Sequence, residues 1–288
     1  MEYTPNNTDT DRFEADGFVV IDQLINTDNL TRLHRAFDAL FNGTFETGVR
    51  PDEVNWQNGQ SDPTLTRQIC NGWKANRDIA RVVLDESLAK AIATFSGWSG
   101  VRIMIDNVIW KPSATKSLGF HQDNAFLSWF DPGEILTCWI ALDDTTRDGG
   151  TVEYARSSHR WNLDAPSGEF HAPIDYRLPA RQAAANANSE LDIHYVEVKA
   201  GGGSFHHGAT WHGSGANLSE NPRRSLVLHA MPADVQYVPD KLDQGIGPIY
   251  SRYKRLHDNT LDENYFPILW RDDGYRTPGI TNYLAVDS

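Results

Sequence analysis

The sequence predicts a mainly β protein, with a β-sandwich or jelly-roll core and flanking helices. After residue 100, short runs rich in β-branched and aromatic residues alternate with turns, which is typical of strands. Before residue 100, apolar residues recur at near-helical spacing. A block of strands with antiparallel-type connections, and helices gathered at one end, favours packed sheets buttressed by helices.

The N-terminal part, residues 13–100, is expected to be mostly helical after one short strand, FVVID at 18–22. Apolar residues after this strand keep helical spacing up to Phe41. Thr27 is placed to cap that helix and Gly43 to stop it.

A second helical pattern covers roughly residues 76–96 and ends at Gly97. The residues between the two helices, 44–72, are rich in Asn, Gly, Pro and Asp. This composition predicts irregular structure, because these residues favour turns and loops.

Residues 101–232 are expected to form the jelly-roll core, with a helical or mobile insert at 178–190. The tail, 233–288, is rich in Tyr, Trp, Pro and Gly and is expected to be an ordered cap, so that 1–288 forms a single domain. The clearest strand candidates are VRIMIDNVIW (101–110), ILTCWIAL (135–142), TVEYA (151–155), DIHYVEV (192–198), GSFHH (203–207) and RSLVLHAM (224–231).

Composition and charge exclude several classes of partner. The formal net charge of −13 disfavours nucleic acid and anionic membrane surfaces, and no cluster of Lys and Arg overrides it locally. No stretch approaches the roughly 18 apolar residues of a membrane span. The polar N-terminus has no apolar export segment, and Cys70 and Cys138 are too few for a disulfide framework, so a cytoplasmic location is expected. An anionic small molecule would need its own buried arginine.

The stretch GFHQDNAF places His121 and Asp123 two residues apart. In a strand, residues i and i+2 project from the same face, so this imidazole and carboxylate could grip one cation. A lone H-x-D pair is common by accident, and a metal site needs a further ligand.

The stretch SFHHGATWHGSG offers candidates for that ligand in His206, His207 and His212. The first two are adjacent, so on a strand they point to opposite faces and cannot both join one site. Eleven residues after His212 comes Arg223, whose planar guanidinium suits a carboxylate. Two histidines and one carboxylate that leave open coordination positions are typical of non-haem Fe(II) oxygenases.

Three motifs together resemble the phytanoyl-CoA dioxygenase family of Fe(II)- and 2-oxoglutarate-dependent oxygenases: FHQD, TCWIALDDTTRDGGTVEYARSSHRW and FHHGATWHGSGANLSENPRRSLVLH. The opening FEADGFVVIDQLI is also similar, and the resemblance covers roughly residues 13–231. It implies a double-stranded β-helix, a cupin-like jelly roll, that uses Fe(II), 2-oxoglutarate and O2. It implies that the iron ligands are His121, Asp123 and His212, that Arg223 binds 2-oxoglutarate, and that Gln122, Trp139, Ser214 and Asn107 lie beside the cosubstrate.

Several of these residues can also be interpreted in a second way. Trp139 lies in an apolar strand and is as well explained by core packing as by contact with the cosubstrate, and His207 is better explained as a supporting histidine than as a ligand. The family position of Asn107 varies in residue type. Arg224 should face outward, because its side chain alternates with that of Arg223. Some family members use an upstream lysine for the cosubstrate, and no lysine of this sequence is assigned to that role.

The resemblance implies that the chain hydroxylates a small-molecule metabolite, or otherwise oxidises an unactivated C–H group, and releases succinate and CO2. Halogenating relatives replace the metal Asp by a small residue, so Asp123 favours hydroxylation, desaturation or cyclisation. One alternative is a metal-containing jelly roll that binds a ligand without redox chemistry, although it would not need Arg223. A zinc hydrolase is disfavoured because H-E-x-x-H is absent. The sequence is compatible with a homo-oligomer.

Overall fold

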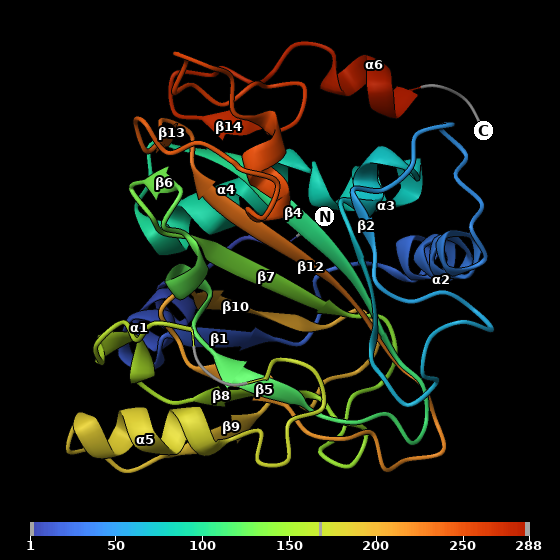
Figure 1. Ribbon diagram of the computed structural model, residues 1–288, viewed down its shortest axis with the longest axis vertical. Helices are drawn as coiled ribbons and strands as arrows, with labels where there is room; N and C mark the ends of the chain where they lie inside the picture. The colour runs from blue at the N-terminus through green and yellow to red at the C-terminus, as the bar shows by residue number, and fades with distance from the viewer. Residues whose placement is uncertain (1–2, 167–168, 286–288) are drawn as a thin grey trace.

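The computed structural model describes residues 3–166 and 169–285, and its centre is formed by two antiparallel sheets (Figure 1). The larger sheet has the order β1-β10-β7-β12-β4-β3-β2, with β14 also paired to β4. Its strands are β1 (Phe18–Ile21), β2 (Glu53–Val54), β3 (Arg67–Cys70), β4 (Gly100–Lys111), β7 (Leu136–Ala141), β10 (Gly203–His207), β12 (Arg223–Pro232) and β14 (Ile268–Arg271).

The smaller sheet has the order β5-β11-β8-β9, and a separate pair joins β13 to β6. Trp139 and Val227 of the larger sheet share one buried apolar cluster with Val152 and Tyr154 of the smaller sheet. The two sheets therefore face each other across a common core, which confirms the predicted jelly roll. The strands are β5 (Leu118–His121), β6 (Phe130–Asp131), β8 (Val152–Ala155), β9 (Ile193–Tyr195), β11 (His212–Ser214) and β13 (Gln236–Tyr237).

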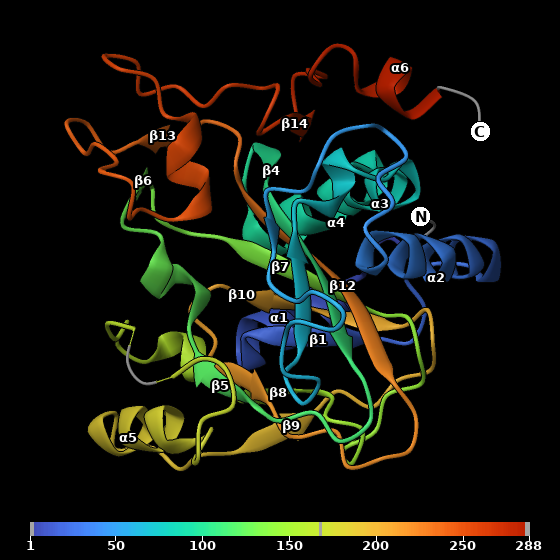
Figure 2. The same ribbon diagram turned by 45° about the vertical axis from the view of Figure 1, so that its right-hand side comes forward.

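Helices cover the outer face of the larger sheet. Figure 2 shows α2, α3 and α4 on the side away from the smaller sheet, whereas α5 lies beside the smaller sheet. No helix within the described ranges combines the length and apolar character needed to cross a bilayer. The helices are α1 (Asn7–Asp16), α2 (Thr27–Phe41), α3 (Arg77–Val83), α4 (Glu86–Ser96), α5 (Leu178–Asn186) and α6 (Ile280–Ala285), with 3-10 turns η1 (Gly72–Lys74), η2 (Asp123–Phe126), η3 (Ser158–Arg160) and η4 (Ile249–Tyr253).

The first predicted helix forms as α2, but its cap is Asn26 and not Thr27. The Asn26 side chain accepts a hydrogen bond from the backbone N–H of Asn29 at 3.0 Å, which satisfies a free donor of the first turn. Thr27 is already the first helical residue.

The second predicted helix is two helices, α3 and α4, because Asp85 interrupts it. Its carboxylate accepts hydrogen bonds from the backbone N–H groups of Ser87 and Leu88, at 2.8 and 3.1 Å, and so begins α4. The apolar spacing continues across the break, so periodicity alone does not reveal it.

Two N-terminal segments contain regular structure that was not predicted. Residues 44–72 contain β2 and β3, and β3 extends the larger sheet beside β4. The unpredicted helix α1 begins at a capping box formed by Asn6 and Asp9 and ends at Gly17, whose φ is 82°. The insert at 178–190 contains α5, and the tail contains β13, η4, β14 and α6.

Candidate metal centre

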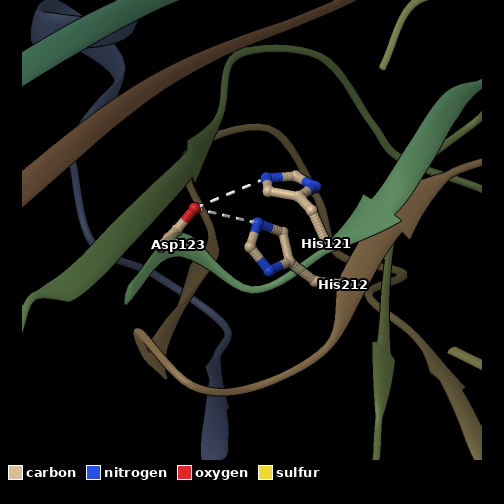
Figure 3. A group of neighbouring side chains, drawn as sticks. All are labelled: His121, Asp123 and His212. Atoms are coloured by element: carbon tan, nitrogen blue, oxygen red, sulfur yellow. Dashed lines mark ion pairs between the residues drawn. The ribbon is translucent and has the colours of Figure 1, made fainter. Parts of the chain in front are cut away.

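His121, Asp123 and His212 converge between the two sheets (Figure 3). His121 and His212 are paired residues on the neighbouring strands β5 and β11, so their imidazole rings lie side by side, 4.2 Å apart between centroids. The Nε2 atoms of His121 and His212 lie 3.4 and 3.5 Å from Asp123 Oδ1. One potential ligand atom from each residue lies within 4.8 Å of the others, close enough for all three to hold one metal ion.

The reason that His121 and Asp123 meet differs from the prediction. Strand β5 ends at His121, and Asp123 begins the 3-10 turn η2. The shared direction of the two side chains therefore comes from a turn after the strand and not from i, i+2 alternation within it.

Hydrogen bonds fix the orientation of both imidazoles. The Nδ1 atom of His121 lies 3.0 Å from the Gly119 carbonyl oxygen, and that of His212 lies 3.0 Å from the Thr210 carbonyl oxygen. Because a carbonyl only accepts, each Nδ1 donates, and each Nε2 keeps a lone pair directed at the centre. Burial lowers the pKa of His212 well below its ordinary value, which favours the neutral ring that a metal requires.

The second oxygen of Asp123, Oδ2, is held from the opposite side by three side chains of the larger sheet. Thr137 donates its hydroxyl at 2.9 Å, His206 Nε2 lies at 3.2 Å and His229 Nδ1 lies at 3.5 Å. Burial tends to raise the pKa of the Asp123 carboxyl, but the neighbouring imidazoles outweigh it and hold that pKa well below its ordinary value. Asp123 is therefore an ionised ligand with one oxygen directed at the histidine pair.

The sequence analysis did not assign Thr137, His206 or His229 to the site. Strand alternation does place His206 inward, fully enclosed beside Tyr154, while His207 is only partly buried. His229 lies six residues after Arg223 on β12, an even spacing that puts both side chains on the same face. Extending the alternation along β12 would have found it.

Two buried cations meet beyond the metal ligands. Arg223 and Lys111 are paired residues on β12 and β4. The ammonium of Lys111 donates to Ser214 Oγ at 2.8 Å and also to the Gly215 carbonyl, while the Arg223 guanidinium binds the Gly150 carbonyl at 2.9 and 3.1 Å. No role for Lys111 was predicted from the sequence.

These two cations lack a partner of opposite charge within the described ranges. The carboxylates nearest to them are already paired, Asp143 with Arg224 and Glu153 with Arg177. Burial lowers the pKa of Arg223 to about 10 and that of Lys111 well below its ordinary value. A pair of desolvated cations is costly without an anion, so the arrangement fits an anionic ligand.

A cavity of about 490 Å³ joins the metal ligands to Arg223. Trp139 lies on its wall, with its ring centre 5.9 Å from the Arg223 guanidinium carbon. Asn107 also lines it and accepts hydrogen bonds from Gln68 Nε2 at 3.0 Å and Cys70 Sγ at 3.2 Å. The residues predicted for the site that line this cavity are His121, Asp123, His212, Arg223, Trp139, Ser214 and Asn107.

Gln122 is not among the residues that line this cavity. Its amide donates to the Ala209 carbonyl at 2.8 Å and accepts from the Asp164 N–H at 3.0 Å, so it ties together two loops beside the ligands. Its predicted contact with the cosubstrate stays a prediction that these bonds do not favour. Arg224 points away from the cavity, as alternation predicted, and pairs with Asp143.

Comparison with known proteins agrees with this architecture. The family model "Phytanoyl-CoA dioxygenase (PhyH)" matches residues 13–225. Peroxisomal phytanoyl-CoA dioxygenase of Rattus norvegicus is 23% identical, over 80% of this chain and 69% of that protein. Ectoine dioxygenase of Streptomyces coelicolor is 25% identical, over 76% of this chain and 75% of that protein.

A solved structure of the epimerase SnoN, in complex with Fe3+, α-ketoglutarate and nogalamycin RO, has a similar fold. Its TM-score is 0.68 at 22% identity, with 91% of this chain and 98% of that chain covered. The family match covers all three potential metal ligands and ends two residues after Arg223. The chain belongs to the phytanoyl-CoA dioxygenase family.

Proposed function

We propose that this protein hydroxylates an unactivated C–H group of a small, uncharged metabolite, and that it uses Fe(II), 2-oxoglutarate and O2 and releases succinate and CO2. Its enzyme class, the 2-oxoglutarate-dependent non-haem iron oxygenases, is that of its family. Asp123 completes a ligand set of two histidines and one carboxylate, which supports hydroxylation, desaturation or cyclisation over halogenation.

The observation that carries the proposal is a pair of buried cations without an anion: Arg223, which lines the cavity that contains the potential metal ligands, and Lys111, its partner on β4. Buried charges are normally paired, so the site lacks a negative partner. A dicarboxylic oxo-acid supplies that partner with one end and offers its oxo-acid end to the metal. The donor set at the other end fits iron, since it comprises two imidazoles and an ionised carboxylate.

Each group of the protein then has a defined task. His121, Asp123 and His212 hold the metal, and iron with bound cosubstrate supplies the oxidising chemistry. Thr137 and His206 fix the far oxygen of Asp123, which orients the near oxygen. Arg223 and Lys111 bind the distal carboxylate of 2-oxoglutarate.

The cavity supports an uncharged substrate, because the lining carboxylate Glu53 is bound to Arg252 at 3.3 Å and the lining cation is assigned elsewhere. Among the described residues that line it, Arg223 is the one lysine or arginine, and its position assigns it to the cosubstrate. No further cation faces the cavity to bind the phosphates of a coenzyme A thioester. The wall opposite the ligands is largely apolar and includes Met104, Ile105 and Ile249.

Titration of the Fe(II)-loaded protein with 2-oxoglutarate under anaerobic conditions tests the proposal. We expect the charge-transfer colour of an Fe(II) chelate in the wild-type protein and its weakening in Arg223→Ala. A ligand-binding jelly roll without redox chemistry would give no such band. A panel of uncharged metabolites, screened for substrate-dependent succinate release, would then identify the substrate.

The buried, unpaired state of Cys70 and Cys138 supports a reducing compartment such as the cytoplasm as the site of action. A net charge of −13 supports the absence of nucleic acid and anionic membrane partners. Fractionation of cells that express the protein would test the location directly.

A further inference from the structure

Part of the cavity wall comes from the tail of the chain, outside the region that the family shares. The family match ends at residue 225, whereas Pro248, Ile249 and Tyr250 line the cavity together with the metal ligands. Ile249 and Tyr250 begin the short turn η4, which contacts β13 through Tyr237. This part of the wall therefore lies beyond the residues that the family model matches.

One end of η4 is attached to the metal-binding segment. The Tyr250 hydroxyl donates to the carbonyl oxygen of Phe126, the last residue of η2, and η2 begins with Asp123. The Tyr250 carbonyl in turn accepts from the Tyr237 hydroxyl at 2.6 Å. Tyr250 thus connects the wall to the turn that carries a metal ligand.

The other end of η4 is attached to the N-terminal part through Tyr253. Its hydroxyl donates to the Asp52 carboxylate and accepts from the Lys74 ammonium at 2.8 Å. Lys74 also binds Asp52 at 2.6 Å and lies 4.3 Å from the centre of the Tyr253 ring. The Lys74 and Asp52 side chains are only 9% and 12% exposed, so water competes little for these bonds.

A neighbouring contact reaches the cavity itself. Arg252 donates to the Asp52 carbonyl at 3.1 Å and to the Glu53 carboxylate at 3.3 Å. Glu53 lines the cavity on the side of β2. The turn η4 therefore spans the cavity from η2 to β2, and both of its ends are fixed by hydrogen bonds.

The Lys74–Asp52 pair has a role that stability does not explain. A buried ion pair contributes little net stability, because the cost of desolvating both charges offsets their attraction. The ion pair does restrict the position of Tyr253, because the Tyr253 hydroxyl is hydrogen-bonded to both the ammonium and the carboxylate. This contact fixes the position of η4 relative to the metal ligands.

We propose that η4 is the wall that selects the substrate, and that Tyr253 is the positioning residue that seats it through Asp52 and Lys74. Its apolar side chains, Pro248 and Ile249, meet an apolar part of the substrate that approaches the metal. The statement that this wall contacts a substrate rests on the proposed function, whereas the attachment of η4 through Tyr253 does not.

Hydrogen exchange of the iron-free protein tests the seating. In Tyr253→Phe, which keeps the ring and removes the hydroxyl and both of its hydrogen bonds to charged groups, we expect backbone exchange across residues 248–253 to rise about tenfold or more. Tyr275→Phe is the matched control, because its hydroxyl also binds a carboxylate, Glu263 at 2.9 Å, and it does not contact η4. Unchanged exchange across residues 248–253 in Tyr253→Phe would overturn the proposal.

Two further measurements separate the substrate wall from the cosubstrate site. Tyr253→Phe should bind 2-oxoglutarate with wild-type affinity in the anaerobic titration. If its affinity for 2-oxoglutarate fell as much as its affinity for substrate, the wall would not act on substrate alone.

Ile249→Trp fills the cavity from η4. The bulkiest metabolites of the panel that the wild type oxidises should no longer react, whereas the smallest should remain active. An unchanged set of active metabolites would overturn the assignment of η4. Failure of the wild-type protein to form the 2-oxoglutarate chelate would instead overturn the proposed function, and the hydrogen-exchange result would stand.

Discussion

Lys111 and Arg223 lie opposite each other on β4 and β12, and both donate to the hydroxyl of Ser214, at 2.8 and 3.4 Å. Two cations that share one neutral acceptor repel each other, and burial strengthens that repulsion. A bound carboxylate would relieve it by accepting hydrogen bonds from both groups. The site is thus destabilising for the ligand-free protein and favourable for an anionic ligand.

Lys111→Met should separate these two effects. Methionine keeps the apolar stem and removes the buried charge, so the ligand-free variant should unfold at a temperature equal to or above that of the wild type. Its affinity for 2-oxoglutarate should fall about tenfold, since one charge-assisted hydrogen bond is lost. Thermal unfolding of the Fe(II)-loaded protein without oxygen, with and without 2-oxoglutarate, measures both effects.

Lys90→Met is the control, because Lys90 is 54% exposed and pairs only with Glu86 on the surface of α4. It should leave the 2-oxoglutarate-dependent shift unchanged. If Lys111→Met showed the same shift as Lys90→Met, the second cation would not bind the cosubstrate.

Arg223 and Arg224 should differ sharply despite being adjacent. Arg223→Ala removes the buried guanidinium that we propose binds the distal carboxylate with two hydrogen bonds. Loss of such a contact costs about 2–5 kcal/mol, so 2-oxoglutarate should bind roughly 30-fold or more weakly. Arg223→Lys should recover only part of this loss, because an ammonium does not reproduce the planar fork. Anaerobic titration of the Fe(II)-loaded variants gives the affinities.

Arg224→Ala is the internal control, because its guanidinium is bound to Asp143 on the outer side of the sheet. Its 2-oxoglutarate affinity should match that of the wild type. A large loss in Arg224→Ala with a small one in Arg223→Ala would reverse the assignment of the two side chains.

Alanine at His121 or His212 should abolish turnover and leave the fold intact, because both side chains face a cavity and their loss removes no packed core. Iron content after desalting and succinate release together report the effect. His207→Ala, on β10 of the larger sheet, is the matched control, since its ring is outside the ligand group and only partly buried. Wild-type iron content and turnover in either ligand variant would refute the assignment.

The regular elements of the fold were largely predictable because their patterns are local. The apolar spacing of α2 and the β-rich runs of β4, β7 and β12 each lie within one short window. The break before α4 was not predictable from spacing, because a capping aspartate within a continuous apolar pattern does not alter the period. The strand β3 was missed because its neighbours in sequence favour loops, and only pairing with β4 makes it a strand.

The residues of the candidate site were likewise predictable only where their pattern is local. His121, Asp123 and His212 stand in short motifs that the sequence displays. Lys111 and Thr137 stand in apolar strands, and their roles depend on which strands become neighbours. The pairing of β4 with β12 brings Lys111 to Arg223, and the facing of the two sheets brings Thr137 to Asp123. Such contacts follow from topology and register, which a single sequence does not specify.

Thr137 allows a test of how the larger sheet controls the metal. Its hydroxyl lies 2.9 Å from Asp123 Oδ2 and 2.8 Å from His229 Nδ1, so it orders the carboxylate and relays a hydrogen bond from the imidazole. Thr137→Val keeps the shape of the side chain and removes this donor. Supporting bonds to a metal ligand are typically worth 10–100-fold in affinity, so we expect Fe(II) to bind about tenfold more weakly.

Competition with an Fe(II) chelator under anaerobic conditions measures that affinity. Thr145→Val is the matched control, because the Thr145 hydroxyl is equally buried and donates to the Val196 carbonyl at 2.9 Å, away from the metal ligands. Both variants lose the hydrogen bonds of one buried hydroxyl, at about 0.5–1.5 kcal/mol of stability per bond, but only Thr137→Val should lose iron affinity. Equal iron affinities in the two variants would show that the far oxygen of Asp123 needs no support from the sheet, because the two imidazoles and the turn η2 alone would then orient the carboxylate.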